Sequence, residues 1–500
     1  MSTEELDVLV VGAGLSGIGA GYFLQTQCPQ LSYAILEGRD SIGGTWDLFR
    51  YPGIRSDSDM FTLGFSFRPW RGEKAIADGP SILKYMRDVA AEFGIDRRVR
   101  LRHWVRSAQW SSQDARWTVE VEVGPEKTLT RYSCRFLYSC GGYYSYESGF
   151  APQFPGMDQF KGQIVHPQYW PEDLDYSGKR VVVIGSGATA VTLVPSMAGK
   201  AAHVTMLQRS PTYVINQPDR DSMVNALRHV LPERMVYMLG RWKYLLLTQA
   251  FYHFCRFAPN LARKLLRLLT KLQLPRGYEV DKHFNPKYQP WDQRLCVVPN
   301  GDLFKAIKRG EASIVTDEIA SFTPTGVRLK SGSELPADII VTATGLKLVP
   351  CGGITLSVDG RPVDLAKTYT YRGLLLGDVP NFAFCVGYVN ASWTLRAELS
   401  SQLVCRILNH MSEHGYTQVV AKVDDPTMEM RPLLDLSAGY VLRATDTFPK
   451  QGVRAPWQYR QNFFVERLAM NRTSLERDDV LHFSKGGAAV ASPSKSKLAA

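Results

Sequence analysis

Two glycine-rich turns have the residue spacing that binds nucleotide phosphates. The first reads GAGLSG from Gly12 and the second reads GSGATA from Gly185; each follows a mostly apolar run. Glycine lets the backbone turn tightly and approach a pyrophosphate, and the next helix points its free N–H groups at the phosphates. The sequence therefore predicts two dinucleotide sites. Their candidate cofactor-binding residues are Gly12, Gly14, Ser16, Gly17, Gly185, Gly187, Ala188 and Thr189.

The residue that follows the second strand of each site indicates which dinucleotide fits. In the first site, residues 33–36 predict a strand that leads into Glu37, where a carboxylate accepts both ribose hydroxyls and disfavours a 2′-phosphate. In the second site, residues 204–207 lead to Arg209 and Ser210, which suit a 2′-phosphate. We therefore expect FAD or NAD in the first site and NADPH in the second. The alternatives are an ordinary tight turn and a surface arginine.

Apolar runs predict the elements that hold these turns. Residues 6–11 and 181–184 are expected to form buried parallel strands, because they are nearly continuous in apolar residues, and each turn then opens a helix. Residues 313–315, 326–329 and 337–341 predict further strands of the second unit, which closes at an A-T-G turn. The predicted fold class is α/β, with two Rossmann-like units.

Length and composition fit a multidomain globular protein. Of the 500 residues, 45% are hydrophobic and 21% are charged, and no apolar run is long enough to span a membrane. The net charge of +11 would suit nucleic acid, but no nucleic-acid-binding motif occurs, so no such partner is expected. The eight cysteines are scattered without a C-x-x-C, and no metal-ligand pattern occurs. We expect a cytoplasmic protein without a signal peptide or a catalytic metal.

Two longer strings match known signatures. F-x-G-x-x-x-H-x-x-x-W-P is met from Phe160 to Pro171, and G-G-x-W-x-x-x-x-Y-P-G-x-x-x-D is met from Gly43 to Asp57. Both resemble the type I Baeyer–Villiger monooxygenases. The related flavin-containing monooxygenases carry Tyr or Phe where this chain has Trp170. The match runs through the whole chain and looks closest to the branch that contains the mycobacterial ethionamide-activating monooxygenase.

The resemblance implies two dinucleotide-binding domains, one for FAD and one for NADP, with a helical insertion in the NADP domain. The implied boundaries are 1–145 and 346–484 for the FAD domain with a C-terminal extension, 146–221 and 283–345 for the NADP domain, 222–282 for the insertion, and 485–500 for a disordered tail.

The resemblance also assigns site residues. The loop 43–57 is expected along the flavin, with Asp57 near the active-site arginine, which maps to Arg294. Gln293 stands where several relatives place a lysine that binds the NADPH phosphate, so the strength of the NADPH preference stays open. The cofactor-binding residues added in this way are Gly44, Thr45, Trp46, Asp47, Tyr51, Asp57 and Gln293.

The implied reaction uses FAD, NADPH and O₂. NADPH reduces FAD, reduced flavin and O₂ give a C4a-peroxide, and its anion attacks a ketone to yield an ester or lactone; sulfides are expected as further substrates. Arg294, which does not deprotonate, would hold the anion, and Asp57 would orient Arg294. Two alternatives remain open: oxygenation mainly of sulfur or nitrogen, and membrane-docked flavin reduction without oxygenation. A lipophilic ketone or thioether is expected as substrate; the oligomeric state is not predicted.

Three smaller predictions concern the linker and the cleft. His166 is expected to couple cofactor arrival to domain movement, with general-base catalysis as the alternative. The tyrosines of residues 143–146 are expected to pack at the hinge, with a place in the cleft as the alternative. Asn390, Ser392 and Trp393 are candidate cleft residues.

Residues 222–275 combine apolar side chains at helical spacing with basic side chains that are almost unopposed by acids. One hypothesis is a helical insertion whose apolar stripe packs on the NADP domain. The other is a basic amphipathic surface that touches a membrane or admits lipophilic substrates. The basic residues are Arg228, Arg234, Arg241, Lys243, Arg256, Arg263, Lys264, Arg267 and Lys271.

Overall fold

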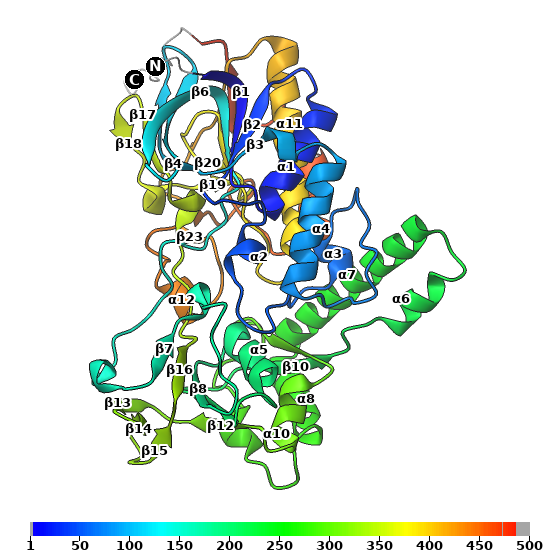
Figure 1. Ribbon diagram of the computed structural model, residues 1–500. Coiled ribbons are helices and arrows are strands. Elements are labelled where there is room, and N and C mark those ends of the chain that lie inside the picture. The colour runs from blue at the N-terminus through cyan, green and yellow to red at the C-terminus, as the bar shows by residue number, and fades with distance from the viewer. Residues whose placement is uncertain (1–3, 473, 487–500) are drawn as a thin grey trace, which may run out of the picture.

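The structure is a computed structural model that describes residues 4–472 and 474–486 (Figure 1). It has two α/β bodies, one above the other in this view. The blue, cyan, yellow and red segments build the upper body, and the green middle of the chain builds the lower one. The tail predicted at 485–500 lies, apart from its first two residues, outside the described residues.

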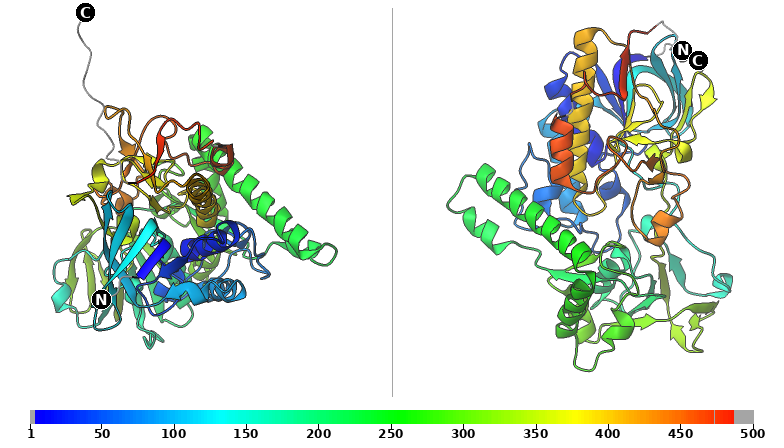
Figure 2. Two further views of the ribbon diagram at one scale, coloured as in Figure 1. Left: turned by 90° about the horizontal axis from the view of Figure 1, so that it is seen from above. Right: turned by 180° about the vertical axis from the view of Figure 1, so that it is seen from behind.

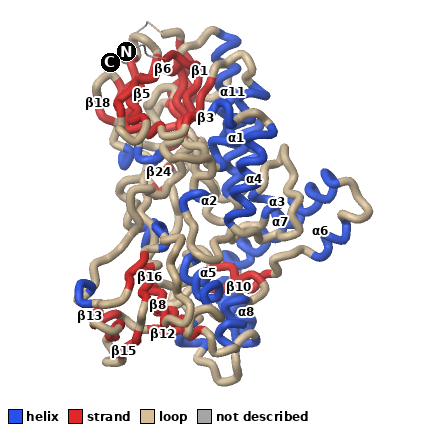
Figure 3. Tube along the Cα trace, viewed as in Figure 1, coloured by secondary structure: helices blue, strands red, loops and turns tan. Residues whose placement is uncertain are grey.

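An eleven-stranded sheet forms the centre of the upper body, and its strand β1 pairs in parallel with β2 on one side and β6 on the other. Helices α1 (Leu15–Gln27), α4 (Gly79–Glu92) and α11 (Trp393–His414) stand together along one side of it (Figure 3). The strands are β1 (Glu4–Val11), β2 (Tyr33–Leu36), β3 (Val99–Arg100), β4 (His103–Ser111), β5 (Arg116–Val123), β6 (Thr128–Ser139), β17 (Thr355–Val358), β18 (Arg361–Pro362), β19 (Thr370–Tyr371), β20 (Leu375–Leu376) and β21 (Phe382–Phe384).

The lower body holds a five-stranded parallel sheet in the order β12-β9-β8-β16-β7, with helices α5 (Ala188–Met197) and α10 (Asp302–Lys308) packed beside it. Its strands are β7 (Gln163–Val165), β8 (Arg180–Ile184), β9 (His203–Gln208), β12 (Ala312–Thr316) and β16 (Ile339–Thr342). Smaller sheets flank it, formed by β10 (Val214–Gln217) with β11 (Cys296–Pro299) and by β13 (Ile319–Thr323), β14 (Gly326–Leu329) and β15 (Glu334–Pro336).

The predicted fold class is confirmed: the eleven-stranded sheet is mixed and the five-stranded sheet is parallel, and in each a strand with parallel neighbours leads through a glycine turn into a helix. Strand β1 ends at Val11 and β8 ends at Ile184, directly before the two turns. Both strands are buried apart from their first residues, as continuous apolar runs require in a parallel sheet. The two turns therefore lie at the carboxyl ends of central strands, which is where open α/β sheets bind ligands.

The insertion consists of helices α6 (Ser222–Leu227), α7 (Glu233–Phe257), α8 (Pro259–Leu272) and α9 (Val280–His283). Helix α7 crosses from the lower body to the upper one, and with α6 it extends outward as an arm (Figure 2). Its residue Tyr237 packs with Phe61 of the upper body, while Leu266 of α8 packs with Tyr213 of the lower one. The hypothesis that the apolar stripe packs on the lower body is therefore correct for α8 and for Phe251 of α7, whereas the part of α7 around Tyr237 packs on the upper body.

Acids elsewhere in the chain oppose several of the insertion's basic residues, so the expectation of almost unopposed charge is wrong. Their partners lie outside residues 222–275, which is why the local sequence did not reveal them. The ion pairs are Arg241–Glu398 at 2.9 Å, Lys243–Asp221 at 2.6 Å, Arg256–Asp292 at 2.9 Å and Arg267–Asp281 at 2.5 Å.

The segment after residue 415 has irregular structure with short elements, which explains why its sequence shows no periodicity. Helices are α12 (Gly439–Leu442) and α13 (Phe463–Arg472); strand β22 (Gln418–Ala421) pairs with β25 (Leu481–Ser484), and β23 (Arg431–Pro432) with β24 (Lys450–Gln451). The short helices α2 (Thr45–Leu48) and α3 (Met60–Leu63) follow β2 in the upper body. No helix among the described residues has the length and apolar character needed to cross a membrane.

Candidate active site

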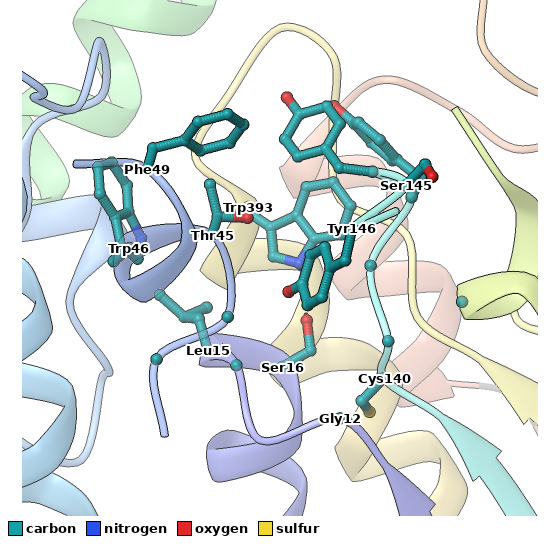
Figure 4. A pocket seen from close by; sticks show the side chains of 18 of the residues that line it. Gly12, Leu15, Ser16, Thr45, Trp46, Phe49, Cys140, Ser145, Tyr146 and Trp393 are labelled. Atoms are coloured by element: carbon teal, nitrogen blue, oxygen red, sulfur yellow. Dashed lines mark hydrogen bonds between the residues drawn. The ribbon is translucent and has the colours of Figure 1, made fainter. Parts of the chain in front are cut away.

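A cleft of about 500 Å³ lies where the β1–α1 turn, the loop after β2 and the start of α5 face one another. Residues 140–147 and Trp393 complete its wall beside Ser16 (Figure 4). The predicted site residues that line it are Gly12, Gly14, Ser16, Glu37, Gly44, Thr45, Trp46, Tyr51, Asp57, Ala188, Thr189 and Arg294. The predicted residues outside its lining are Gly17, Asp47, Gly185, Gly187, Arg209, Ser210 and Gln293.

Glycines leave bare backbone at the floor of the cleft. Gly12 has φ +96°, and a Cβ there would lie 2.8 Å from the Cys140 carbonyl oxygen. Gly44 has φ +54°, and its Cβ would lie 3.0 Å from the Cα of Gly14. Any side chain would close this approach, so the cradle fits a pyrophosphate at the N-terminus of α1. Gly17 acts differently, because a Cβ there would lie 1.8 Å from the Gly12 oxygen and would separate helix from strand.

Glu37, directly after β2, has a carboxylate that two backbone N–H groups fix in position. Its Oε2 accepts a hydrogen bond from the Ala13 N–H at 2.7 Å, and its Oε1 accepts one from the Arg39 N–H at 2.9 Å. The side chain lines the cleft although its residue is only 3% exposed, and burial raises its pKa. A fixed carboxylate with further lone pairs fits the two hydroxyls of an adenosine ribose.

Asp47 supports the loop from behind instead of lining the cleft. Its buried carboxylate forms ion pairs with Arg39 at 2.7 Å, Arg87 at 3.1 Å and Arg50 at 3.6 Å. Three arginines from the loop and from α4 therefore meet at one acid, which fixes the position of the neighbouring Trp46.

The start of α11 reaches the cleft through one residue. The indole Nε1–H of Trp393 donates to the Ser16 hydroxyl at 2.7 Å, and its ring meets Tyr143 edge-on at 5.0 Å (Figure 4). The other two candidates face elsewhere: Asn390 donates to the Gln461 carbonyl, and Ser392 bonds to the Thr62 hydroxyl. Residues 143–146 both line the cleft and pack on each other, so the alternative of a place in the cleft holds for these tyrosines.

Arg294 brings a fixed positive charge to the cleft. Its Nε–H donates to the Val389 carbonyl at 3.0 Å, so a residue at the start of the 389–393 turn orients it. Asp57 lies near enough for its charge to act on Arg294, and burial raises the Asp57 pKa to about 6 against the opposing effect of Arg294 and Arg55. The orienting hydrogen bond therefore comes from Val389, while Asp57 contributes its field.

Arg55 is a cleft residue that the sequence did not reveal. Its Nη1 pairs with the Asp302 carboxylate at 2.6 Å and its Nη2 donates to the Val297 carbonyl at 3.3 Å. It thus ties the loop of the upper body to α10 and β11 of the lower one, two residues from Asp57. Position 55 is one of the unspecified positions of the signature string. The only sign in the sequence that Arg55 belongs to the site is that a basic residue stands inside this string.

The second nucleotide turn faces the same cleft from below. Gly187 caps α5, and a Cβ on it would meet nothing within 4 Å, whereas a Cβ on Gly185 would lie 2.3 Å from the Ala343 oxygen of the A-T-G turn. Arg209 and Ser210 follow β9 and are exposed, so both can reach a ligand at that edge. The residues fit a dinucleotide phosphate and a 2′-phosphate.

Two further predicted residues take part in contacts between segments. The Gln293 amide donates to the Ser437 carbonyl at 3.5 Å, on the side of the C-terminal segment. His166 packs in the linker, where its Nδ1 accepts from the Gln168 N–H at 3.2 Å and burial lowers its pKa. A Cβ on Gly149 would lie 2.0 Å from the His166 ring, so the linker is closely packed here.

Comparison with known proteins shows the family of the chain. The flavin-binding monooxygenase-like family matches residues 77–349, more than half of the chain. The chain belongs to this family. An NAD(P)-binding Rossmann-like domain also matches residues 10–71, around the first glycine turn. The resemblance drawn from the two signature strings is confirmed, and the protein is a flavoprotein monooxygenase.

Relatives that match over the whole chain are also described as flavin-dependent monooxygenases. The chain is 54% identical to the FAD-containing monooxygenase EthA of Mycobacterium tuberculosis, over 98% of this chain and 99% of the relative. It is 47% identical to the probable FAD-binding monooxygenase AlmA of Acinetobacter baylyi, over 99% of each. Among solved structures, its fold is similar to an oxidised steroid monooxygenase bound to NADP (24% identity, TM-score 0.79, 96% of this chain and 100% of that one) and to an open form of cyclohexanone monooxygenase (20% identity, TM-score 0.77, 97% and 100%).

The activity of this flavoprotein monooxygenase is expected to follow the ionisation of Asp57. Because the Asp57 pKa is raised to about 6, the carboxyl is neutral below that pH and negative above it. The ratio kcat/KM should therefore rise with pH through about 6, as the charge near Arg294 appears. Asp57→Asn should remove this acidic limb. Asp59→Asn is the matched control, because the Asp59 pKa is also about 6 but its carboxylate bonds to Thr62; an unchanged limb in Asp57→Asn would contradict the assignment.

Proposed function

We propose that this protein is an FAD- and NADPH-dependent Baeyer–Villiger monooxygenase. It inserts one oxygen atom of O₂ beside a ketone carbonyl to give an ester or lactone, and it also oxidises sulfides. The observation that carries the proposal is Arg294, a fixed cation that lines a cleft shared by two dinucleotide turns, near Asp57. Two comparisons support the proposal. The relatives are named FAD-containing monooxygenases, and the fold is similar to that of a steroid monooxygenase and of cyclohexanone monooxygenase.

Different residues would hold the two cofactors. FAD supplies the hydride acceptor and the centre that activates oxygen. Glu37 binds its ribose, and the bare glycine backbone admits its pyrophosphate. The start of α5 would hold the NADPH pyrophosphate, and Arg209 and Ser210 would hold its 2′-phosphate. Further residues that line the cleft and would contact FAD are Gly12, Gly14, Ser16, Gly44, Thr45, Trp46 and Tyr51.

The side chains around Arg294 explain how the site favours oxygen transfer. The guanidinium presents several N–H donors to negative charge that develops in the cleft, and it needs no reorganisation because Val389 already holds it. Tyr143 and Trp393 present aromatic surface that excludes water. A lipophilic ketone or thioether suits such a lining.

Product analysis with labelled oxygen tests the proposal. The purified holoenzyme is supplied with NADPH, ¹⁸O₂ and either 2-octanone or thioanisole. We expect an ester with one labelled atom from the ketone and a labelled sulfoxide from the thioether. Sulfoxide without ester would point to a heteroatom oxygenase, and NADPH oxidation that yields only hydrogen peroxide would point to a flavin reductase; either result overturns the Baeyer–Villiger proposal.

Arg209 is expected to set the choice of NADPH over NADH. Arg209→Ala should raise the KM for NADPH by about ten- to a hundredfold, the cost of charge-assisted hydrogen bonds to a phosphate, and should leave the KM for NADH unchanged. Steady-state kinetics with both cofactors measure this. Arg309→Ala, at another exposed arginine of the lower body, is the control. Equal changes for NADPH and NADH would show that Arg209 does not contact the 2′-phosphate.

A further inference from the structure

Helix α8 exposes a face of leucines to solvent. We name this the leucine face; its side chains are 42–70% exposed. The adjoining side of the helix packs on the protein, through Ala262, Leu266 and Thr270. Soluble helices normally turn their apolar stripe inward, so a stripe that continues onto the solvent side indicates a surface that something covers. The leucine face consists of Leu261, Leu265, Leu268, Leu269 and Leu272.

The exposure is concentrated in this part of the molecule. Among the described residues, 21 large hydrophobic side chains are exposed, and 14 of them lie between Met223 and Leu272. Phe257, at the end of α7 and one turn before the leucine face, is 92% exposed. The five leucines of the leucine face follow one another along a single helix, whereas Leu129 is a single exposed leucine of the kind that soluble proteins commonly carry.

Positive charge lies along one margin of the leucine face. At about 100° per residue, Lys264 and Lys271 project from the same side of α8, next to the leucines. Arg263 and Arg267 are occupied by Asn285 and Asp281, whereas Lys264 and Lys271 have no ion-pair partner among the described residues. Helix α8 contains no Asp or Glu. The helix therefore offers leucines flanked by the ammonium groups of Lys264 and Lys271, of which Lys271 also helps to lower the pKa of the nearby Asp281 carboxyl.

We propose that the leucine face and Phe257 dock the protein on an anionic lipid bilayer surface. Leucines enter the boundary between headgroups and acyl chains while Lys264 and Lys271 reach the lipid phosphates, the arrangement of an interfacial amphipathic helix. A second copy of this chain fits less well, because symmetric contact between two α8 helices would place the lysines of one against those of the other, with no acid on the helix to compensate.

Vesicle sedimentation of the full-length holoenzyme tests the proposal. Vesicles of phosphatidylcholine with 30% phosphatidylglycerol should bind the protein, and raising the salt concentration should weaken the binding. The double variant Leu265→Ser/Leu268→Ser should lower the partition coefficient at least about tenfold. Lys264→Glu/Lys271→Glu should lower it about tenfold on anionic vesicles and leave binding to pure phosphatidylcholine unchanged. Leu129→Ser, an exposed leucine of the upper body, is the matched control.

Three results would overturn the docking proposal. The first is a wild-type protein that does not sediment with anionic vesicles. The second is equal binding by Leu265→Ser/Leu268→Ser and by Leu129→Ser. The third is a dimer in light scattering that Leu265→Ser/Leu268→Ser dissociates, because the leucine face would then join two copies of the chain. Ketone oxygenation in free solution reports separately on the active site and does not depend on these variants.

Discussion

Replacing Arg294 with alanine should lower the rate of ketone oxygenation by about a thousandfold or more, while FAD remains bound. Loss of one preorganised donor to developing negative charge costs on the order of a hundred- to a thousandfold, and Arg294 offers several donors together with a full charge. FAD retention is expected because its predicted contacts come from the β1–α1 turn, Glu37 and the loop after β2. Product formation and flavin absorbance after gel filtration measure the two effects.

Two further variants test whether the effect is specific to the Arg294 guanidinium: a conservative substitution at Arg294 and a control at another arginine. Arg294→Lys keeps the charge but loses the Nε–H that bonds to Val389, so it should recover only part of the rate. Arg131→Ala, at an exposed arginine paired with Glu120 in the upper sheet, should behave as the wild type. If Arg294→Ala oxygenated ketone at a rate near that of the wild type, the charge on Arg294 would have no part in the chemistry.

The largest expected effect on stability comes from a buried ion pair between α11 and α13. Arg396 is fully buried, and its Nη1 pairs at 2.5 Å with the carboxylate of Glu466 on α13. Its Nη2 donates to the Arg372 carbonyl, and its guanidinium stacks over the Tyr459 ring at 4.9 Å. Glu466→Leu leaves this charge buried without a partner and should lower the free energy of unfolding by about 3–5 kcal/mol.

The matched double variant separates the pair from the packing around it. Arg396→Met/Glu466→Leu removes both charges and should recover most of the lost stability, because an apolar pair of similar volume needs no desolvation. Asp425→Ala breaks the exposed Arg454–Asp425 pair and should cost less than about 1 kcal/mol. Urea titration of the three variants measures these differences. A double variant as unstable as Glu466→Leu would show that the packing, and not the stranded charge, sets the cost.

Features written in consecutive residues could be predicted from the sequence. The strand of residues 33–36 is β2, and the strand predicted at 326–329 is β14 with the same bounds. A strand and the turn after it can be predicted together, because a continuous apolar run and the glycines that follow it are neighbours in the sequence. Residues of both turns accordingly line one cleft, among them Gly12 and Thr189, although Gly17, Gly185 and Gly187 lie outside its lining.

Features that depend on distant partners could not be predicted in this way. Arg241 appeared unopposed, yet its partner Glu398 lies 157 positions further along the chain. In the C-terminal segment, Glu466 of α13 is held by an ion pair with Arg396, which lies 70 positions earlier in the chain. Arg55 stands at an unspecified position of its string, and only the approach of Asp302 gives it a role.

The sequence by itself determined the fold class, the two dinucleotide turns and the family, since each rests on short strings whose chemistry is local. The tertiary structure decided which side chains meet. It brought Val389 to Arg294 across 95 positions, placed Asp47 behind the loop, and left the leucine face of α8 outside while pairing many of its basic neighbours. The physical reason is that burial and charge pairing depend on distance in space, which no local pattern of residues encodes.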